Sequence, residues 1–287
     1  MLRICAQNIR GLYSNHTKKR STDFINNIKS QFDVILLNET HVLDSSEIPS
    51  DWCDLRWIHS ITSKEDSYAG VSFAYSPLLP DPINLSILLL SLPAAASATS
   101  DEDVKARTLF LGFRLQSADI IFCSFYGISN TTSVAGMRRA SKLLTNCHLL
   151  IPLAIELFYK THPPVVNHPL IFIWGGDFNC SPATTYSTLS PQHPSITFQR
   201  LLQSSISTIA TTTTSSPQLQ LSVLPQLANL TSPCCTFTSS AGNPKHLDHF
   251  IIYDPMNLIT QTYFQQQYSE LDHHLHCFII TIILYII

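Results

Sequence analysis

The stretch WGGDFN, residues 174–179, decides the fold of this chain. It follows the apolar run PLIFI, residues 169–173, which has the composition and length of a buried strand. The two glycines are expected to end that strand and to let the backbone approach a ligand closely. Asp177 and Asn179 are two positions apart, so on an extended or tightly turning chain their side chains point the same way.

This pair of polar residues has two interpretations. A carboxylate and an amide at the end of a buried strand can together hold a phosphate oxygen, a nucleophilic water or a hard metal ion. The alternative is a strand followed by an Asx turn, because Asp and Asn both stabilise turns. The hexapeptide alone does not distinguish a site from a turn, so its partners elsewhere in the chain have to decide.

Composition narrows the class of protein. The chain has 287 residues, of which 45 % are hydrophobic and only 13 % are charged, about half of the ~25 % charged content of typical soluble domains. The net charge of −3 does not indicate a polyanion partner, so binding to nucleic acid would need a local basic face or metal ions. The eight cysteines include no C-x-x-C pair, which disfavours a zinc site.

The apolar runs indicate no membrane segment. The N-terminus lacks the apolar core of a signal peptide, and the longest apolar runs, near 83–90 and 277–287, are shorter than the ~20 residues that span a bilayer. We therefore expect an intracellular protein without a membrane partner, in the nucleus or the cytoplasm.

Hydrophobic periodicity predicts mostly strands, joined largely by hairpins, with a few helices between them. The predicted strands cover 2–8, 32–37, 52–59, 68–75, 107–115, 119–126, 169–173, 235–239, 247–253, 259–268 and 278–287. The predicted helices begin near 21, near 196 and at 133, the last being broken or ended near Pro152. Low-complexity composition predicts flexible insertions at about 91–105 and 205–233. Two sheets packed face to face with helices on their outer sides fit this order, as one domain over 1–287.

A polar residue stands at the end of many of the apolar strands. These residues are Asn8, Glu39, Tyr126, Asp177, Asn179, Asp248, Asp272 and His273. If the strands are neighbours, their polar ends meet at one rim. Several carboxylates with two amides and a histidine suit Mg²⁺ and a phosphodiester, because Mg²⁺ takes oxygen ligands and retains some waters. Such a metal orients the phosphate and neutralises charge on the leaving oxygen.

Taken in order, these motifs resemble the endonuclease/exonuclease/phosphatase superfamily, whose members are Mg²⁺-dependent phosphohydrolases with a four-layer sandwich like that of deoxyribonuclease I. The opening QNIRGL, residues 7–12, and LNETH, residues 37–41, are most similar to the target-nicking endonuclease domain of LINE-type retrotransposons. The resemblance runs from Leu2 to about Ile280. It implies nicking of DNA with Mg²⁺, for which Mn²⁺ can substitute, and a reverse transcriptase encoded downstream as a partner.

The resemblance also implies ligands for the metal and contacts to the substrate. Glu39 matches the principal metal ligand, Asn8 matches an asparagine that helps to place metal and phosphate, and Asp248 matches the aspartate before the penultimate strand. The residues that match substrate contacts are Arg10, Asn130 and Thr236.

Five further residues match the family's catalytic positions. Asp177 matches the residue that activates or orients the attacking water, and Asn179 matches the amide that stabilises the pentavalent phosphate. Tyr126 matches a tyrosine that contacts the scissile phosphate. Asp272 and His273 match a pair in which the aspartate holds one imidazole nitrogen while the other nitrogen faces the phosphate.

Some positions depart from the family pattern, and other functions stay open. The segment after Tyr126 has no proline and places Asn130 one position late, and Leu271 replaces a serine. Because fold alone does not select a substrate, a phosphatase acting on a phosphomonoester or an inositol phosphate is an alternative. Low charge, few glycines and the Ser/Thr-rich segment also fit a catalytically inactive remnant of a mobile element.

Overall fold

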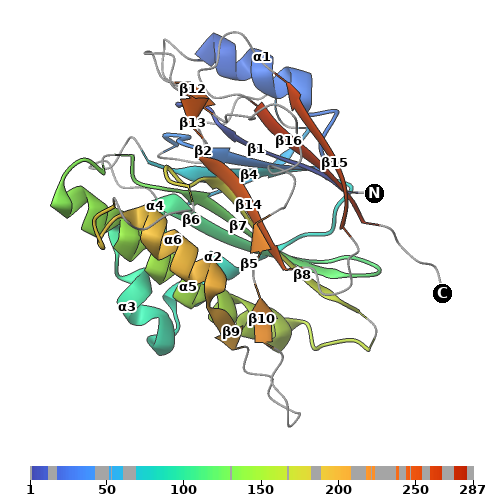
Figure 1. Ribbon diagram of the computed structural model, residues 1–287. Coiled ribbons are helices and arrows are strands. Elements are labelled where there is room, and N and C mark those ends of the chain that lie inside the picture. Colours follow the sequence, from blue (N-terminus) through green and yellow to red (C-terminus); the bar gives the residue numbers. More distant parts are fainter. Residues whose placement is uncertain are drawn as a thin grey trace.

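Two six-stranded β-sheets pack face to face at the centre of the protein (Figure 1). The computed structural model describes residues 2–11, 18–42, 52, 54–60, 69–129, 131–166, 168–181, 189–207, 218–220, 222–223, 237–238, 244–245, 247–253, 259–266 and 275–282.

The first sheet joins the beginning and the end of the chain. In spatial order its strands are β15 (Ile259–Gln266), β16 (Leu275–Ile282), β1 (Leu2–Asn8), β2 (Val34–Asn38), β4 (Val71–Tyr75) and β3 (Arg56–His59). β1 and β2 are parallel, and the other neighbours are antiparallel.

The second sheet has the same plan, with one parallel pair at its centre. In spatial order its strands are β11 (Ser222–Val223), β14 (Asp248–Tyr253), β8 (Leu170–Asp177), β7 (Asp119–Tyr126), β6 (Thr108–Arg114) and β5 (Ile83–Asn84). β7 and β8 are parallel, and the other neighbours are antiparallel. Two small pairs lie outside the sheets: β9 (Ser205–Ser207) with β10 (Gln218–Gln220), and β12 (Phe237–Thr238) with β13 (Pro244–Lys245).

Helices cover the outer faces and complete four layers (Figure 1). Helix α1 (Lys18–Ile28) packs on the first sheet through Phe24, Ile25 and Ile28. The second sheet is covered mainly by α2 (Leu85–Leu90), η4 (Pro93–Ala95), α3 (Ala96–Thr99), α4 (Glu102–Arg107), α5 (Val134–Thr161) and α6 (Pro194–Gln203). The prediction of two packed, mainly antiparallel sheets flanked by helices is confirmed.

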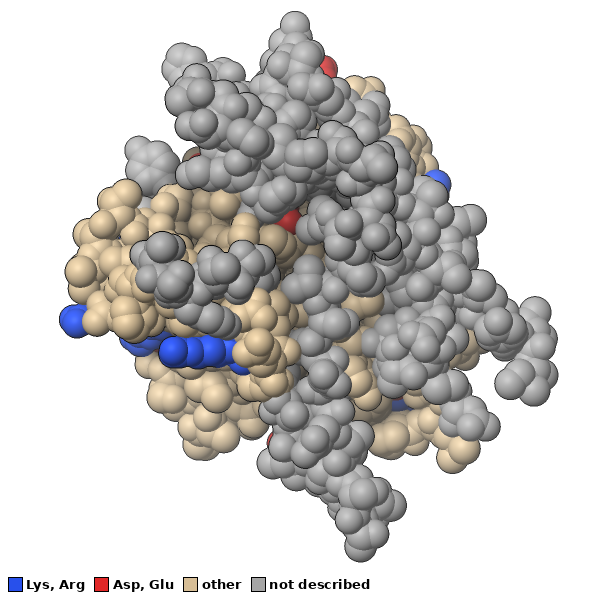
Figure 2. Space-filling model, in the orientation of Figure 1, with Lys and Arg blue, Asp and Glu red and all other residues tan. Residues whose placement is uncertain are grey.

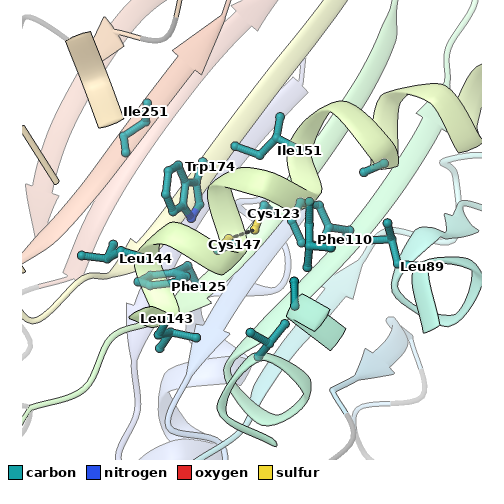
Figure 3. Packing of buried hydrophobic residues seen from close by; sticks show 14 of the residues in the cluster. Leu89, Phe110, Cys123, Phe125, Leu143, Leu144, Cys147, Ile151, Trp174 and Ile251 are labelled. Atoms are coloured by element: carbon teal, nitrogen blue, oxygen red, sulfur yellow. Dashed lines mark hydrogen bonds between the residues drawn. The ribbon is translucent and has the colours of Figure 1, made fainter. Parts of the chain in front are cut away.

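The central strands β2, β7 and β8 consist mostly of apolar residues because both of their faces are buried. β7 is buried over its whole length, and its residues alternate between two cores. Ile120 and Phe122 face the first sheet, whereas Ile121 and Cys123 face the helices. Figure 3 shows this second core around α5, where the Cys123 and Cys147 thiols lie 3.6 Å apart. Both are free and buried, and burial raises the pKa of Cys123.

The structure corrects three expectations. Strand β8 does not end at the glycines but continues through them to Asp177, because Gly175 and Gly176 pair with β14. Helix α5 is not broken near Pro152 and extends to Thr161. A proline inside a helix costs about 3 kcal/mol or more, and burial of the flanking apolar side chains against the second sheet offsets that cost.

The third correction concerns residues 91–105. This segment is not a loop but three short helical pieces, η4, α3 and α4, whose Ala95, Ala98 and Val104 are buried in the core beneath α5. The small alanine side chains that suggest low complexity in the sequence allow this close packing. Of the second expected insertion, 205–233, the described part holds the short strands β9, β10 and β11.

Helix α5 also bears on the expectation of no membrane partner. By length and composition it is apolar enough to cross a membrane, and it is the one such helix in the described part of the chain. Half of its most apolar stretch is buried inside the protein, as in the core helix of a globular domain.

Candidate functional site

The polar strand ends meet because the two parallel pairs place their carboxyl ends at the same edge. In the first sheet Asn8 is in register with Asn38, which precedes Glu39. In the second sheet Tyr126 and Asp248 are both in register with Asp177, one on each side. The site is therefore assembled from segments that lie at the beginning, the middle and the end of the chain.

Asn8 joins the two sheets at this edge. Its Nδ2 donates a hydrogen bond to Asp177 Oδ2 at 2.9 Å, and its Oδ1 accepts one from the backbone N–H of Arg10 at 3.1 Å. Asn8 also forms a hydrogen bond with the Glu39 carboxylate. Both Asn8 and Asp177 are almost completely buried. A single amide thus fixes the carboxylates of Glu39 and Asp177 relative to each other.

Glu39 is held as an ionised carboxylate. Burial by itself would raise its pKa, but the neighbouring His41, Asn8 and Tyr126 side chains outweigh burial and leave the pKa of Glu39 below its usual value. The His41 Nε2 lies 3.7 Å from Glu39 Oε1. The Glu39 side chain is still 20 % exposed, so a ligand can reach it.

Tyr126 stays protonated beside these carboxylates. Burial raises its pKa well above the usual value, and the charges of Glu39 and Asp177 raise it further, while Arg107 opposes the shift. The phenol hydrogen-bonds to Glu39. Tyr126 can therefore act as a hydrogen-bond donor at this edge at any ordinary pH.

Asn179 occupies the turn after β8. Its backbone N–H donates to Asp177 Oδ1 at 2.8 Å, and its side-chain Nδ2 donates to the Gly127 carbonyl oxygen at 2.9 Å. The first bond is that of an Asx turn, so the turn interpretation of the hexapeptide describes the local backbone. It does not exclude a site, because the same turn brings Asp177 and Asn179 against the segment that follows Tyr126.

Backbone strain is concentrated at this edge. Four non-glycine residues of the described chain have a positive φ: Arg10, Glu39, His41 and Asn179. All four belong to the turns that follow β1, β2 and β8. Such conformations cost on the order of 1–3 kcal/mol each and cluster at functional sites, where the surrounding contacts hold them. The strain therefore points to this edge as the functional part of the protein.

Asn38 is a site residue that the sequence analysis misses. It is completely buried, and its Nδ2 donates to the Phe125 carbonyl at 2.9 Å while its Oδ1 accepts the backbone N–H of Asp177 at 3.2 Å. It therefore ties β2 of the first sheet to β7 and β8 of the second. Its position directly before Glu39 is the only signal in the sequence, and nothing there shows that its side chain points into the protein.

Two buried hydroxyl groups connect a histidine to the turn that contains Glu39. His59 Nδ1 lies 2.6 Å from Ser72 Oγ, and that hydroxyl donates to Thr40 Oγ1 at 3.2 Å. Thr40 and Ser72 are buried, and Trp57 stacks on the His59 ring. The partly buried imidazole is thus connected to the residue next to Glu39.

This histidine makes stability depend on pH. Burial lowers the pKa of His59 to about 4 in the folded protein, below the ordinary value of 6.5. Between those two values the unfolded chain binds more protons, so the free energy of unfolding falls as pH decreases from 6.5 towards 4, by at most about 3 kcal/mol. Urea unfolding at several pH values should show a shallower decrease for His59→Gln than for the wild type. An identical pH dependence in both proteins would contradict this assignment.

The donor set can be tested against Mg²⁺. Among the residues that the structure describes, no three His, Cys, Asp or Glu side chains form a metal-binding group. Mg²⁺ does not require one, because it is commonly held by one or two carboxylates and several waters. The ionised, partly exposed carboxylate of Glu39, with the oxygen-bearing side chains of Asn8 and Asp177 beside it, fits that kind of site.

Four predicted site residues, Asp272, His273, Thr236 and Asn130, lie outside the described residues. Strand β16 begins at Leu275, and its His276 pairs with Ala6, two positions before Asn8. The chain therefore enters β16 at the same end of β1 that carries the site. The roles of these four residues remain predictions.

Comparisons with known proteins bear on the fold. No protein-family model and no curated protein matches the sequence. Among solved structures, the AP endonuclease LMAP from Leishmania major is 16 % identical, with 98 % of this chain and 87 % of that chain covered at a TM-score of 0.64. The 3′ phosphatase NExo from Neisseria, bound to a product DNA hairpin, is 13 % identical, with 98 % and 99 % covered at a TM-score of 0.63. The endonuclease domain of TRAS1, a telomere-specific non-LTR retrotransposon, is 14 % identical, with 98 % of each chain covered at a TM-score of 0.53.

These similarities identify the architecture. The chain has a deoxyribonuclease I-like fold of two packed sheets flanked by helices, which it shares with these structures over 98 % of its length at low sequence identity. This fold is shared by nucleases and phosphatases that act on phosphoesters, and the resemblance inferred from the sequence motifs is confirmed at this level.

Proposed function

We propose that the protein is a Mg²⁺-dependent phosphodiesterase that nicks DNA, in the manner of the target-site endonucleases of non-LTR retrotransposons. The observation that carries this proposal is that Asn8, which interacts with Glu39 of the first sheet, donates a hydrogen bond to the Asp177 carboxylate of the second. The retrotransposon assignment is supported by the QNIRGL and LNETH motifs and by the likeness to the TRAS1 endonuclease domain.

Each residue has a part in this proposal. Mg²⁺ bound at Glu39, with Asn8 and Asp248 close by, would supply positive charge for the phosphate and for the leaving oxygen. Asp177 would orient a water molecule and accept its proton. Asn179 and Tyr126 would donate hydrogen bonds to the phosphate oxygens as negative charge develops on them.

The proposed reaction is a hydrolysis. The water oxygen forms a bond to phosphorus, the bond between phosphorus and the 3′ oxygen breaks, and the 3′ oxygen takes up a proton. The products are a 5′-phosphate and a 3′-hydroxyl, and the latter can prime DNA synthesis. Asp272 and His273 are proposed to help at the phosphate, and Arg10, Asn130 and Thr236 to contact the DNA.

The charge distribution predicts that DNA binding depends strongly on the metal. In the view of Figure 2, most of the visible Lys and Arg side chains lie over the helical layer that covers the second sheet. Two basic residues of α5 are paired with acids: Lys142 Nζ lies 2.8 Å from Asp101, and Arg139 Nε lies 2.6 Å from Asp103. Paired cations release fewer counterions from DNA, so they add less to its affinity than free ones.

A plasmid-nicking assay tests the proposal. Supercoiled DNA should become nicked with Mg²⁺ and stay intact with EDTA, and the nick should prime a DNA polymerase without prior phosphatase treatment. Glu39→Gln should lower the rate on the order of 10²-fold, because it removes the charge that holds the metal. Glu102→Gln is the matched control, since this exposed glutamate on α4 makes only an ion pair with Lys105.

Two results would reject the endonuclease proposal: nicking that survives EDTA, or equal rates for Glu39→Gln and Glu102→Gln. A DNA duplex with a 3′-phosphate end belongs in the same assay, because the Neisseria 3′ phosphatase has a similar fold at a TM-score of 0.63. Release of phosphate from that end without nicking would favour a phosphatase.

A further inference from the structure

A buried arginine lies directly behind the candidate site. Arg107 is the last residue of α4 and is only 7 % exposed. Its guanidinium carbon lies 4.8 Å from the centre of the Tyr126 ring, within the range of a cation–π contact. Its Nη1 approaches the Gly127 carbonyl oxygen at 3.4 Å. The same carbonyl accepts the side-chain N–H of Asn179.

An ion-pair network fixes this guanidinium. Asp103, one turn earlier on α4 and 8 % exposed, accepts a hydrogen bond from Arg107 Nε at 3.3 Å. Asp103 also accepts hydrogen bonds from Arg139 of α5. A buried carboxylate shared by two guanidiniums leaves Arg107 little freedom to leave the Tyr126 ring. Helix α4, which belongs to the segment expected to be a flexible insertion, therefore reaches the edge of the site.

The positive charge of Arg107 also affects how strongly the site repels a phosphate. The acids Glu39 and Asp177 act on the same Tyr126 as Arg107, and their negative charges repel a phosphodiester. A buried cation behind Tyr126 offsets part of that repulsion without contacting the substrate, because charges interact more strongly in the protein interior than in water.

We propose that Arg107 is a positioning residue of this site, which holds the Tyr126 ring and the Gly127 carbonyl, and through them Asn179, in the arrangement used for the phosphate. This inference rests on the proposed function. It assigns to Arg107, and to the Asp103–Arg139 pair that holds it, a part in positioning the site, although none of these residues belongs to the motifs identified in the sequence.

The test compares Arg107→Met with Arg114→Met. Arg114 lies at the other end of β6, pairs with the buried Asp119 at 2.8 Å and stacks on Phe158 at 5.9 Å, so it loses the same kinds of contact. At ~3.3 Å per residue the two arginines are roughly 23 Å apart along the strand. We expect Arg107→Met to lower kcat for nicking roughly tenfold with KM changed less than about threefold, and Arg114→Met to leave both within about threefold. Equal losses of kcat in the two variants would overturn the proposal.

A double-mutant cycle with Tyr126→Leu separates positioning from general destabilisation. If Arg107 acts through Tyr126, Arg107→Met should lower kcat by less than about twofold in the Tyr126→Leu background. If the roughly tenfold loss persists there, Arg107 does not act through Tyr126 and the proposal is wrong.

A second measurement tests the positioning of Tyr126 by Arg107 even if the proposed function is wrong. If the wild type does not nick DNA, the same cycle is measured on urea unfolding without substrate. Coupling of about fivefold or more in the unfolding equilibrium constant would show that Arg107 holds Tyr126. Independent effects of the two substitutions would overturn the positioning proposal irrespective of the reaction catalysed.

Discussion

Replacement of Asp177 by asparagine should lower the rate of Mg²⁺-dependent nicking by about 10³-fold while the protein stays folded. The change keeps the shape of the side chain but removes the charge that would accept a proton from the attacking water. Both oxygens of Asp177 accept hydrogen bonds, one from the side chain of Asn8 and one from the backbone N–H of Asn179. The change replaces one of these acceptor oxygens by an N–H₂ group. One of these contacts therefore becomes donor against donor.

The measurement is single-turnover nicking of supercoiled DNA, with thermal unfolding of each variant as the control for folding. Asp81→Asn is the matched substitution, because Asp81 is 83 % exposed and pairs with Arg56 outside the site. It should nick at the wild-type rate. If Asp177→Asn nicks as fast as Asp81→Asn, the hydrolytic role assigned to this edge of the sheets is wrong.

Replacement of Gly176 by alanine should destabilise the protein by about 3 kcal/mol or more. Gly176 has a φ of +142°, which side-chain-bearing residues rarely adopt. An added Cβ would lie 2.1 Å from the Phe125 carbonyl oxygen and 2.9 Å from Asn38 Oδ1. Neither neighbour can retreat, because the first is backbone of β7 and the second is held by its own hydrogen bonds.

Gly175→Ala is the control for this prediction. The atoms nearest to a Cβ at Gly175 belong to side chains, those of Phe250 at 2.6 Å and of Leu36 at 3.3 Å, and side chains yield more readily than the backbone of β7. For a chain of this size each kcal/mol lowers the melting temperature by roughly 2–4 °C. Gly176→Ala should therefore melt roughly 6–12 °C below the wild type, and Gly175→Ala less than half as far below. Equal shifts for the two variants would show that the close approach at Gly176 is not what requires glycine.

The local features of the candidate site follow from the sequence. The apolar run before Asp177 predicts a buried strand, and the Asp and Asn after it predict a turn with two aligned polar groups. β8 and the Asn179 turn have these properties. Two strand-forming runs, each followed by a polar residue, likewise predict β1 ending at Asn8 and β2 ending just before Glu39. Such features depend on neighbours in the chain, so they can be inferred from local pattern.

Local pattern fails where distant packing decides the outcome. Pro152 predicts the end of a helix, yet α5 continues because its apolar residues are buried against the second sheet. The alanines near residue 95 suggest a loop, yet they pack beneath α5. The local preference is a few kcal/mol at most, and burial of several apolar side chains exceeds it.

By itself, the sequence determined which residue types end the strands, and with them the chemistry that this protein can perform. Only the tertiary structure decided which of these residues meet. Asn8 and Asp177 are 169 positions apart and touch because two parallel strand pairs lie in packed sheets. The tertiary structure also added Asn38 and Arg107 to the site. Each is a buried side chain that contacts atoms of strands distant in the chain, so the order of residues does not show these contacts.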